Sequence, residues 1–338
     1  MTKPRVSVLV PVCDAEATLE SALASALTQT YEELELVVVL NGITDRSAEI
    51  VRQVASRDPR VRVFERDRAN LAEALSEGLE RCEGELIVRH DADDHMASTR
   101  VALQVQALDA HPEWVGVTAG VRSVGLDSPP GAGMGRHVDW LNSLDTPELI
   151  RAGRFIDAPL AHPAVTFRRE EVLEAGGYRD GDFPEDHELW LRLFERGASF
   201  GSVRETLVDW TDRPDRFTRT NTRCRDEARR GLVHTYLASG PLANGRRARI
   251  WGAGPFGKRH ARDLHRRFGC VDALIDIDPK KIGRQVAGGL PVVSHESIGP
   301  PDGRLVLLAV GSAGAREQIE SFLRERGHAI ERDYLPLH

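Results

Sequence analysis

VSVLVPVCDAEATLESALASALTQTYEELELVVVL, residues 6–40, is the part of the chain that sets its fold class. Two apolar, β-branched runs at 6–12 and 34–40 flank an Ala- and Leu-rich segment, 15–29, that has helical spacing. Strands that are apolar at nearly every position are buried on both faces, which is typical of parallel sheets covered by helices. The pattern therefore predicts a βαβ unit and an α/β fold.

The same alternation continues as far as residue 90. Helices are predicted at 45–57 and 71–82, and strands at 61–65 and 85–90. Ligands of such sheets bind beyond the carboxyl ends of the strands. The last of these strands runs into RHDADDHM (89–96), so three carboxylates follow a buried strand at the edge where a ligand is expected.

The carboxylates of Asp91, Asp93 and Asp94 would repel one another unless a positive group or water lies among them. A hard cation such as Mg²⁺ or Mn²⁺ takes oxygen ligands, often one or two carboxylates together with substrate phosphates. The D-x-D spacing is compatible with such a site. A second interpretation is that Asp93 or Asp94 caps a helix that begins near Ser98. The three residues by themselves leave both interpretations open.

The middle of the chain carries a second pair of acids. PEDHELWLRLFERG (184–197) has helical spacing with one apolar face, and Glu185 and Asp186 lie at its start. The helix dipole alone would favour acids there. The segment AVTFRR (164–169) predicts a strand, and the Gly- and Pro-rich stretch 121–136 predicts a loop.

A linker-like stretch, LASGPLANGRR, precedes a second βα alternation. We therefore expect two domains, 1–243 and 244–338. The second contains Gly252-x-Gly254-x-x-Gly257 between a predicted strand and a helix.

Asp276 follows this glycine motif at the end of the next predicted strand. The arrangement is that of a dinucleotide fingerprint, with NAD(P) as the cofactor class, and indicates a small Rossmann-like α/β domain. Glycines can also be kept for turn geometry and close packing alone. A nucleotide-binding module and a degenerate regulatory module both remain open.

Composition excludes several classes of protein. The net charge of −7 over 338 residues argues against broad nucleic-acid binding, and the four cysteines form no CxxC pair that would suggest a zinc site. No apolar stretch has the length of a transmembrane helix, and no signal peptide is recognised. We expect a cytoplasmic protein, and peripheral association with the inner face of the membrane is compatible with this composition. The stretch 213–230 holds seven Arg against three acids, and guanidinium groups suit phosphate contacts.

Three ordered segments resemble family 2 glycosyltransferases. They are the opening region from VSVLVPV to NGITDRS, the HDADD motif, and HPAVTFRREEVLEAGGYRDGDFPEDHELWLRL, which together span residues 5–215. The resemblance implies a GT-A fold, a mixed and mainly parallel sheet between helices. It also implies inverting transfer of a sugar from a nucleotide-diphosphate donor to a hydroxyl of a glycan or lipid-linked acceptor, in surface glycan or polysaccharide biosynthesis.

The resemblance also assigns roles to residues. It implies a Mg²⁺ or Mn²⁺ ion on Asp93, with Asp91 at the metal or the ribose, and Asp186 as the general base. The remaining residues that it implies are Val10, Pro11 and Asn41 in the base pocket, and His162 and Glu185 on the acceptor side. From the arginine-rich stretch 213–230, Arg216 and Arg219 are the candidates for contact with the diphosphate, whereas most of its arginines are expected on a solvated helix face.

Two departures from the family pattern bear on these roles. Leu40 and Asn41 stand where the family usually has two acids, so the donor base stays open. Cys13 and Asp14 replace an aromatic residue and an Asn, and Asp14 is a candidate cap for the following helix.

Two other functions compete with glycosyl transfer. An NAD(P)-dependent oxidoreductase acting on a sugar nucleotide would use the glycine motif, but the chain offers no recognisable catalytic Tyr-x-x-x-Lys or Cys/His arrangement for it. A non-catalytic sugar-nucleotide-binding protein would not need two intact acid clusters.

Overall fold

Two units make up the computed structural model, which describes residues 4–126, 128–312 and 314–338. The first unit is Met1–Arg151 with Ala158–Arg225, and the second is Ala152–Asp157 with Asp226–His338. Residues 226–243 thus group with the second unit, whereas our predicted boundary at 243/244 assigns them to the first domain. The boundary stays a prediction.

Among the described residues, the first unit is built on an eight-stranded sheet with the order β3-β2-β1-β4-β7-β6-β8-β5. The first four of these strands run parallel to one another, so their carboxyl ends meet at one edge. This confirms the α/β architecture expected from residues 6–40. The strands are β1 (Val6–Val12), β2 (Leu34–Asn41), β3 (Val61–Arg66), β4 (Leu86–Arg89), β5 (His95–Met96), β6 (Trp114–Gly125), β7 (Thr166–Arg168) and β8 (Ser199–Asp212).

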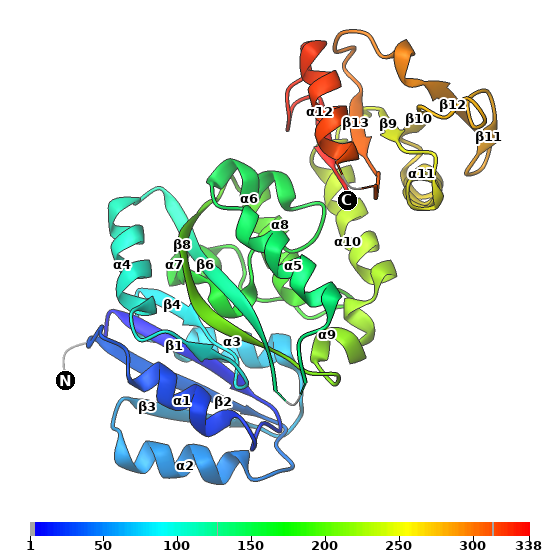
Figure 1. The fold of residues 1–338 in the computed structure, drawn as a ribbon. Helices are drawn as coiled ribbons and strands as arrows, with labels where there is room; N and C mark the ends of the chain where they lie inside the picture. The colour runs from blue at the N-terminus through cyan, green and yellow to red at the C-terminus, as the bar shows by residue number, and fades with distance from the viewer. Residues whose placement is uncertain (1–3, 127, 313) are drawn as a thin grey trace. The chain divides into compact units, whose positions relative to one another are not determined.

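Helices cover both faces of this sheet (Figure 1). One face packs against α1, α2, α4 and α5, and the other against α3, α7 and α8. Burial on both faces explains why β1 and β2 are apolar at nearly every position. The helices are α1 (Leu19–Leu27), α2 (Ser47–Arg57), α3 (Leu71–Arg81), α4 (Arg100–Ala110), α5 (Ala132–Ser143), α6 (Pro147–Gly153), α7 (Arg169–Glu174), α8 (Glu185–Glu195) and α9 (Phe217–Thr220), with short 3₁₀ turns η1 (His162–Ala164) and η2 (Thr222–Cys224).

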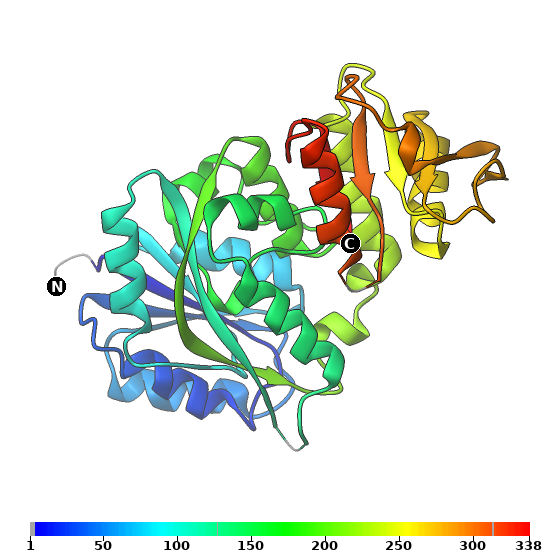
Figure 2. The ribbon, with the colours of Figure 1, turned by 45° about the horizontal axis from the view of Figure 1, so that its top comes forward.

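The second half of the sheet depends on long-range pairing. β7 is antiparallel to both β4 and β6, while β6 and β8 run parallel and side by side over most of their length (Figure 2). The loop predicted at 121–136 is wrong in extent, because β6 continues to Gly125 and α5 begins at Ala132. Pairing with β8 holds the first part of this stretch extended despite its glycine content.

The second unit has a six-stranded sheet among its described residues, in the order β11-β12-β10-β9-β13-β14. Strands β9, β10, β12, β13 and β14 pair in parallel, and β11 is antiparallel to β12. No helix in the described part of the chain is long and apolar enough to cross a bilayer. The elements are α10 (Asp226–Ser239), β9 (Ala248–Trp251), α11 (Pro255–Phe268), β10 (Val271–Asp276), β11 (Gln285–Val286), β12 (Leu290–Ser294), η3 (His295–Ser297), β13 (Leu305–Leu308), α12 (Ala315–Glu325) and β14 (Tyr334–Pro336).

Candidate active site

The predicted acid cluster lies where the sequence pattern indicates, just beyond the carboxyl end of β4. Asp91, Asp93 and Asp94 each offer a carboxylate oxygen, and these three atoms lie within 4.8 Å of one another. The helix-cap interpretation is wrong, because α4 begins at Arg100 and Thr99 at its N-cap position makes no side-chain cap. The cluster is therefore not explained as a helix start.

Two arginines and a backbone amide hold the cluster. Arg89, which is only 1% exposed, places Nη2 2.6 Å from Asp91 Oδ1. Nε of Arg213 lies 3.3 Å from Asp93 Oδ2. Asp94 Oδ1 accepts a hydrogen bond of 2.8 Å from the backbone N–H of Thr211, at the end of β8. The end of β8 thus fixes the loop that follows β4.

The three carboxyl groups have different affinities for a proton. Burial is the largest single effect on Asp91 and opposes its ionisation, but the charge of Arg89, the hydrogen bond from Arg89 and smaller effects of other nearby groups together lower the pKa of Asp91. Burial, and then the negative charge of Asp91, raise the pKa of Asp93 to about 6. The same two causes, with the charge of Asp93 added, raise the pKa of Asp94 well above its ordinary value. The cluster is short of positive charge.

The donor set fits a hard divalent cation. In the described part of the chain, the buried Oδ2 of Asp94 has no hydrogen-bond partner, although a carboxylate oxygen in such a place normally has one. Carboxylate oxygens are the ligands that Mg²⁺ and Mn²⁺ prefer. A dication would supply both the missing partner and the missing charge.

The second acid pair lies at the start of α8. Glu185 is 6% exposed, and burial raises the pKa of its carboxyl group. Asp186 is less buried, and its Oδ1 accepts a hydrogen bond of 2.7 Å from the backbone N–H of His187. The negative charge of Asp186 also raises the pKa of Tyr178, after the larger effect of burial. Of the two acids, Asp186 is the more exposed to solvent.

Arg89 is the common electrostatic neighbour of both acid groups. Its charge stabilises the ionised forms of Asp91 and Glu185. It also lowers the pKa of His162 further, after the larger effect of burial, so that the imidazole is neutral. Nε2 of His162 lies 2.8 Å from the hydroxyl oxygen of Tyr178. The structure thus brings His162, Glu185 and the Asp91 cluster around one buried guanidinium.

The residues predicted for the base pocket lie at the same edge of the sheet. Val10 and Pro11 are buried on β1, and Asn41 ends β2 with 3% of its surface exposed. Asn41 Oδ1 accepts a hydrogen bond of 2.9 Å from the backbone N–H of Asn70, just before α3. This oxygen is therefore used inside the fold, and the base-pocket role of these residues stays a prediction.

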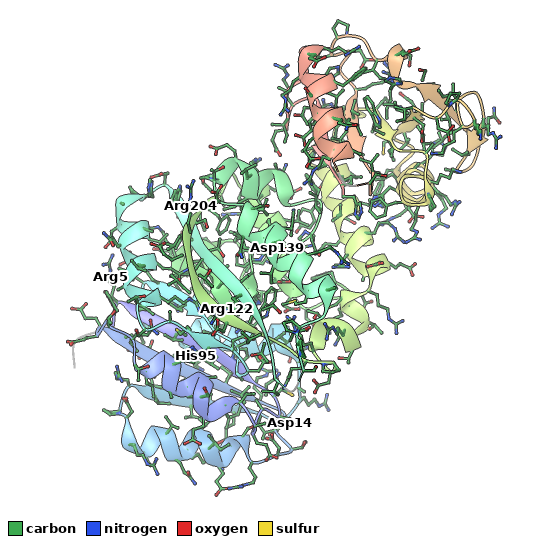
Figure 3. The ribbon with its side chains drawn as sticks, viewed as in Figure 1. Arg5, Asp14, His95, Arg122, Asp139 and Arg204 are labelled. Atoms are coloured by element: carbon green, nitrogen blue, oxygen red, sulfur yellow. The ribbon has the colours of Figure 1, made fainter. Side chains whose placement is uncertain are left out.

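Asp14 joins two loops at this edge (Figure 3). Its carboxylate accepts hydrogen bonds from the backbone N–H (2.6 Å) and the hydroxyl group (2.7 Å) of Thr44. The helix-cap interpretation of Asp14 is wrong, because α1 begins at Leu19 and Asp14 does not cap it. Asp14 instead ties the loop after β1 to the loop after β2.

The two arginines predicted at the diphosphate behave differently. Arg216 stacks on the ring of Trp210 at 4.7 Å, and its charge favours the ionised forms of Asp91, Asp93 and Asp94. Arg219 lies 2.7 Å from Asp212 Oδ1. Arg216 is therefore near the acid cluster, while Arg219 stabilises its own loop. Their contacts with a donor stay a prediction.

The glycine motif of the second unit is largely explained by packing. Gly252 has φ +118°, and a Cβ there would lie 2.5 Å from the carbonyl oxygen of Ala309. A Cβ on Gly257 would lie 1.8 Å from the carbonyl oxygen of Gly252, whereas a Cβ on Gly254 would meet no described atom within 4 Å. Two of the three glycines are therefore required for close backbone packing within the second unit.

Asp276 is also used within the second unit. Its Oδ2 accepts hydrogen bonds from the backbone N–H of Ala253 (2.8 Å) and from Lys281 Nζ (3.1 Å). It therefore holds the glycine loop in place. A nucleotide or NAD(P) at this loop stays a prediction.

Sequence reasoning missed several residues that shape the first site. Arg89 and Tyr178 were not singled out, and neither was the backbone amide of Thr211. The signal for Arg89 was present, because an arginine inside the apolar run ELIVRH must find a buried acid or leave a charge unpaired. The contact of Thr211 with a residue 117 positions away gives no local signal.

Comparison with known proteins agrees with this geometry. The model of Glycosyl transferase family 2 matches residues 7–177. The amylovoran biosynthesis glycosyltransferase AmsE of Erwinia amylovora is 30% identical over 205 residues, which are 60% of this chain and 74% of that protein. The putative glycosyltransferase EpsE of Bacillus subtilis (strain 168) is 28% identical over 221 residues, 64% of this chain and 76% of that protein.

Solved structures share the fold. TarS of S. aureus gives a TM-score of 0.55 at 15% identity, covering 78% of this chain and 44% of TarS. The mannosyltransferase PcManGT of Pyrobaculum calidifontis, solved with GDP-Man and Mn²⁺, gives 0.52 at 20% identity, covering 78% of this chain and 70% of that one. With the family match, these likenesses identify the chain as a glycosyltransferase of family 2 with the GT-A fold.

Proposed function

We propose that this protein is a divalent-metal-dependent, inverting glycosyltransferase that uses a nucleotide-diphosphate sugar. The observation that carries the proposal is the presence of two separate acid groups, Asp91–Asp94 and Glu185–Asp186, around the buried Arg89. One group suits a cation and the other suits proton transfer. PcManGT, solved with GDP-Man and Mn²⁺, and TarS, solved with UDP-GlcNAc, support a donor of this class.

The two acid groups and Arg216 would have different roles in the reaction. Asp93 would hold the cation, with Asp91 and Asp94 beside it, and the bound cation would neutralise charge on the departing diphosphate. Asp186 would take the proton of the acceptor hydroxyl as that oxygen attacks the anomeric carbon from the face opposite the leaving group. Arg216, already stacked beside the cluster, would bind the diphosphate oxygens.

The acceptor is proposed from the relatives alone. AmsE is named for amylovoran biosynthesis, and WbnJ of Escherichia coli, 26% identical over 213 residues, for O-antigen biosynthesis. We therefore propose a hydroxyl group of a glycan or lipid-linked glycan as the acceptor, in polysaccharide or O-antigen biosynthesis.

A donor-hydrolysis and transfer assay across UDP-, GDP- and dTDP-sugars, with and without EDTA, tests the proposal. Release of sugar should need Mg²⁺ or Mn²⁺ and should be lost in Asp93→Ala. Asp186→Asn should keep near-normal donor binding and lose transfer. Asp139→Asn, an exposed change on α5, is the matched control and should stay active (Figure 3).

The outcomes separate the alternatives. Proton NMR of the first product should show an anomeric configuration opposite to that of the donor, and retention would contradict inversion. EDTA-resistant transfer would contradict the metal role. Absorbance changes of NAD(P)H without release of sugar would instead support an oxidoreductase.

A further inference from the structure

The charge of this protein is unevenly divided along the chain. Residues 1–225 contain 27 Lys and Arg against 39 Asp and Glu, whereas residues 226–338 contain 18 against 13. The net charge of −7 thus hides a surplus of five positive charges after residue 225. Such asymmetry between the two halves of a chain is a sign of a charged partner.

Ion pairs use up most of the acids in this second part. The paired acids are Asp226 with Arg229, Asp263 with Arg230, Asp272 with Arg247 and Arg304, Asp276 and Asp278 with Lys281, Asp302 with Arg249, Glu320 with Arg324, Glu331 with Arg154, and Asp333 with Arg332. Few acids in this part of the chain are therefore left to balance its remaining Lys and Arg residues.

Four of them lie on α11. Lys258, Arg259, Arg262 and Arg266, called here the α11 basic face, form no ion pair or side-chain hydrogen bond within the described part of the chain. The nearest acid by its electrostatic effect is Asp226, whose pKa Arg259 helps to lower, but Asp226 is already held by Arg229 at 2.7 Å. The basic face is uncompensated.

The helix presents these cations together. At about 100° per residue the four fall within about 100° of arc, and from Lys258 to Arg266 they span about 12 Å. The opposite side of α11 is buried in its own unit, through Gly257, His260, Ala261 and Leu264. Arg259, Arg262 and Arg266 are exposed. Asp263, the single acid in α11, is paired with Arg230.

We propose that the α11 basic face binds the surface of an anionic phospholipid bilayer. A cluster of four or more Lys and Arg on one helix is attracted to anionic lipids. Arginine and lysine also contact the phosphates and guanine bases of nucleic acids, so duplex DNA is included below as a competing polyanion. Mobile lipid headgroups can gather beneath cations fixed on a helix. Because charges are screened beyond about 8 Å at physiological ionic strength, the local surface outweighs the net charge of the chain.

This binding goes beyond sugar transfer and is measured without it. The whole protein is sedimented with vesicles of phosphatidylcholine alone or of phosphatidylcholine mixed with phosphatidylglycerol, at low and high salt. The test variant is Arg259→Gln/Arg262→Gln/Arg266→Gln. The matched control, Arg46→Gln/Arg52→Gln/Arg57→Gln, removes the same charge from exposed positions at α2 in the acidic first unit.

The wild-type protein should bind the phosphatidylglycerol vesicles, bind phosphatidylcholine weakly, and dissociate as salt rises. Each lost arginine should weaken binding about fivefold, so the α11 variant should bind about 100-fold more weakly. The α2 variant should bind like the wild type. Circular dichroism and thermal melting should show both variants folded.

Three results would overturn the proposal. They are no binding of the wild-type protein to anionic vesicles, equal binding by the wild-type protein and the α11 variant, and loss of binding to the same degree in the α2 variant. Tighter binding to dextran sulfate or duplex DNA than to the vesicles would also overturn it, because the partner would then be another polyanion.

Discussion

Arg192 on α8 locks the start of the proposed catalytic helix to the turn before it, and replacing it should destabilise the first unit. Its guanidinium is 7% exposed and donates to both Glu188 oxygens, at 3.0 and 2.8 Å. It also donates to the carbonyl oxygens of Ala175 and Gly177. Arg192→Met would leave Glu188 without its main counter-ion and two carbonyls without a donor.

The size of the effect follows from this burial. Breaking a buried ion pair by removing one partner costs about 3–5 kcal/mol. Arg179, 3.4 Å from Glu188 Oε1 but half exposed, gives partial compensation, so we expect the lower end, about 3 kcal/mol. For a unit of this size, that corresponds to a fall in Tm of about 6–12 °C.

Calorimetry and urea titration of the whole protein measure this change. Arg196→Met, an exposed arginine just after the same helix, is the control and should change stability by less than about 0.5 kcal/mol. The double variant Glu188→Leu/Arg192→Met should be more stable than Arg192→Met, since no buried charge is then left alone. If Arg192→Met unfolds like Arg196→Met, or if the double variant is the least stable, this account of α8 is wrong.

Three further predictions concern the other sites. Because the pKa of Asp93 is raised to about 6, protons should compete with Mn²⁺ below that pH, and titration calorimetry should show affinity falling up to about tenfold per pH unit. Gly257→Ala should lower the free energy of unfolding by about 3 kcal/mol or more, because its Cβ would lie 1.8 Å from a backbone oxygen. Gly254→Ala should change it by less than about 1 kcal/mol in thermal melting. Equal effects of the two variants would contradict the packing argument. Burial lowers the pKa of both His234 and His260 to about 3. As pH falls through about 6.5, these histidines therefore take up protons in the unfolded chain before they do so in the folded one. The free energy of unfolding should drop by about 2 kcal/mol per histidine between pH 6.5 and 5, and the drop should be smaller in His260→Gln.

Local patterns in the sequence predicted the first half of the fold well. The apolar runs at 6–12, 34–40 and 85–90 became β1, β2 and β4, because strands buried on both faces leave an unbroken hydrophobic signal. Parallel strands then place their carboxyl ends together, which is why the position of Asp91 and Asp93 could be predicted.

Long-range pairing was beyond reach of the same reasoning. Residues 121–125 read as loop because glycine and proline follow closely, yet β8 pairs with them from more than 80 positions away. The partners of Asp93 and Asp94, Arg213 and Thr211, are still more distant in sequence. The glycine motif is ambiguous for another reason, since a glycine kept for packing and one kept for a phosphate look the same in sequence.

The negative charge of the acid cluster is only partly balanced, and this affects how tightly the donor and the dication bind. Arg89 neutralises Asp91 from a buried position, but the raised pKa values of Asp93 and Asp94 indicate that the nearby arginines do not balance the whole cluster. The proposed sugar-nucleotide donor would bring further negative charge to the same edge of the sheet. Donor and dication should therefore each bind weakly alone and strengthen the other by the same factor, because binding linkage is reciprocal. On this reasoning Arg89 would stabilise the folded site, and the proposed dication would let an anionic pocket accept an anionic donor.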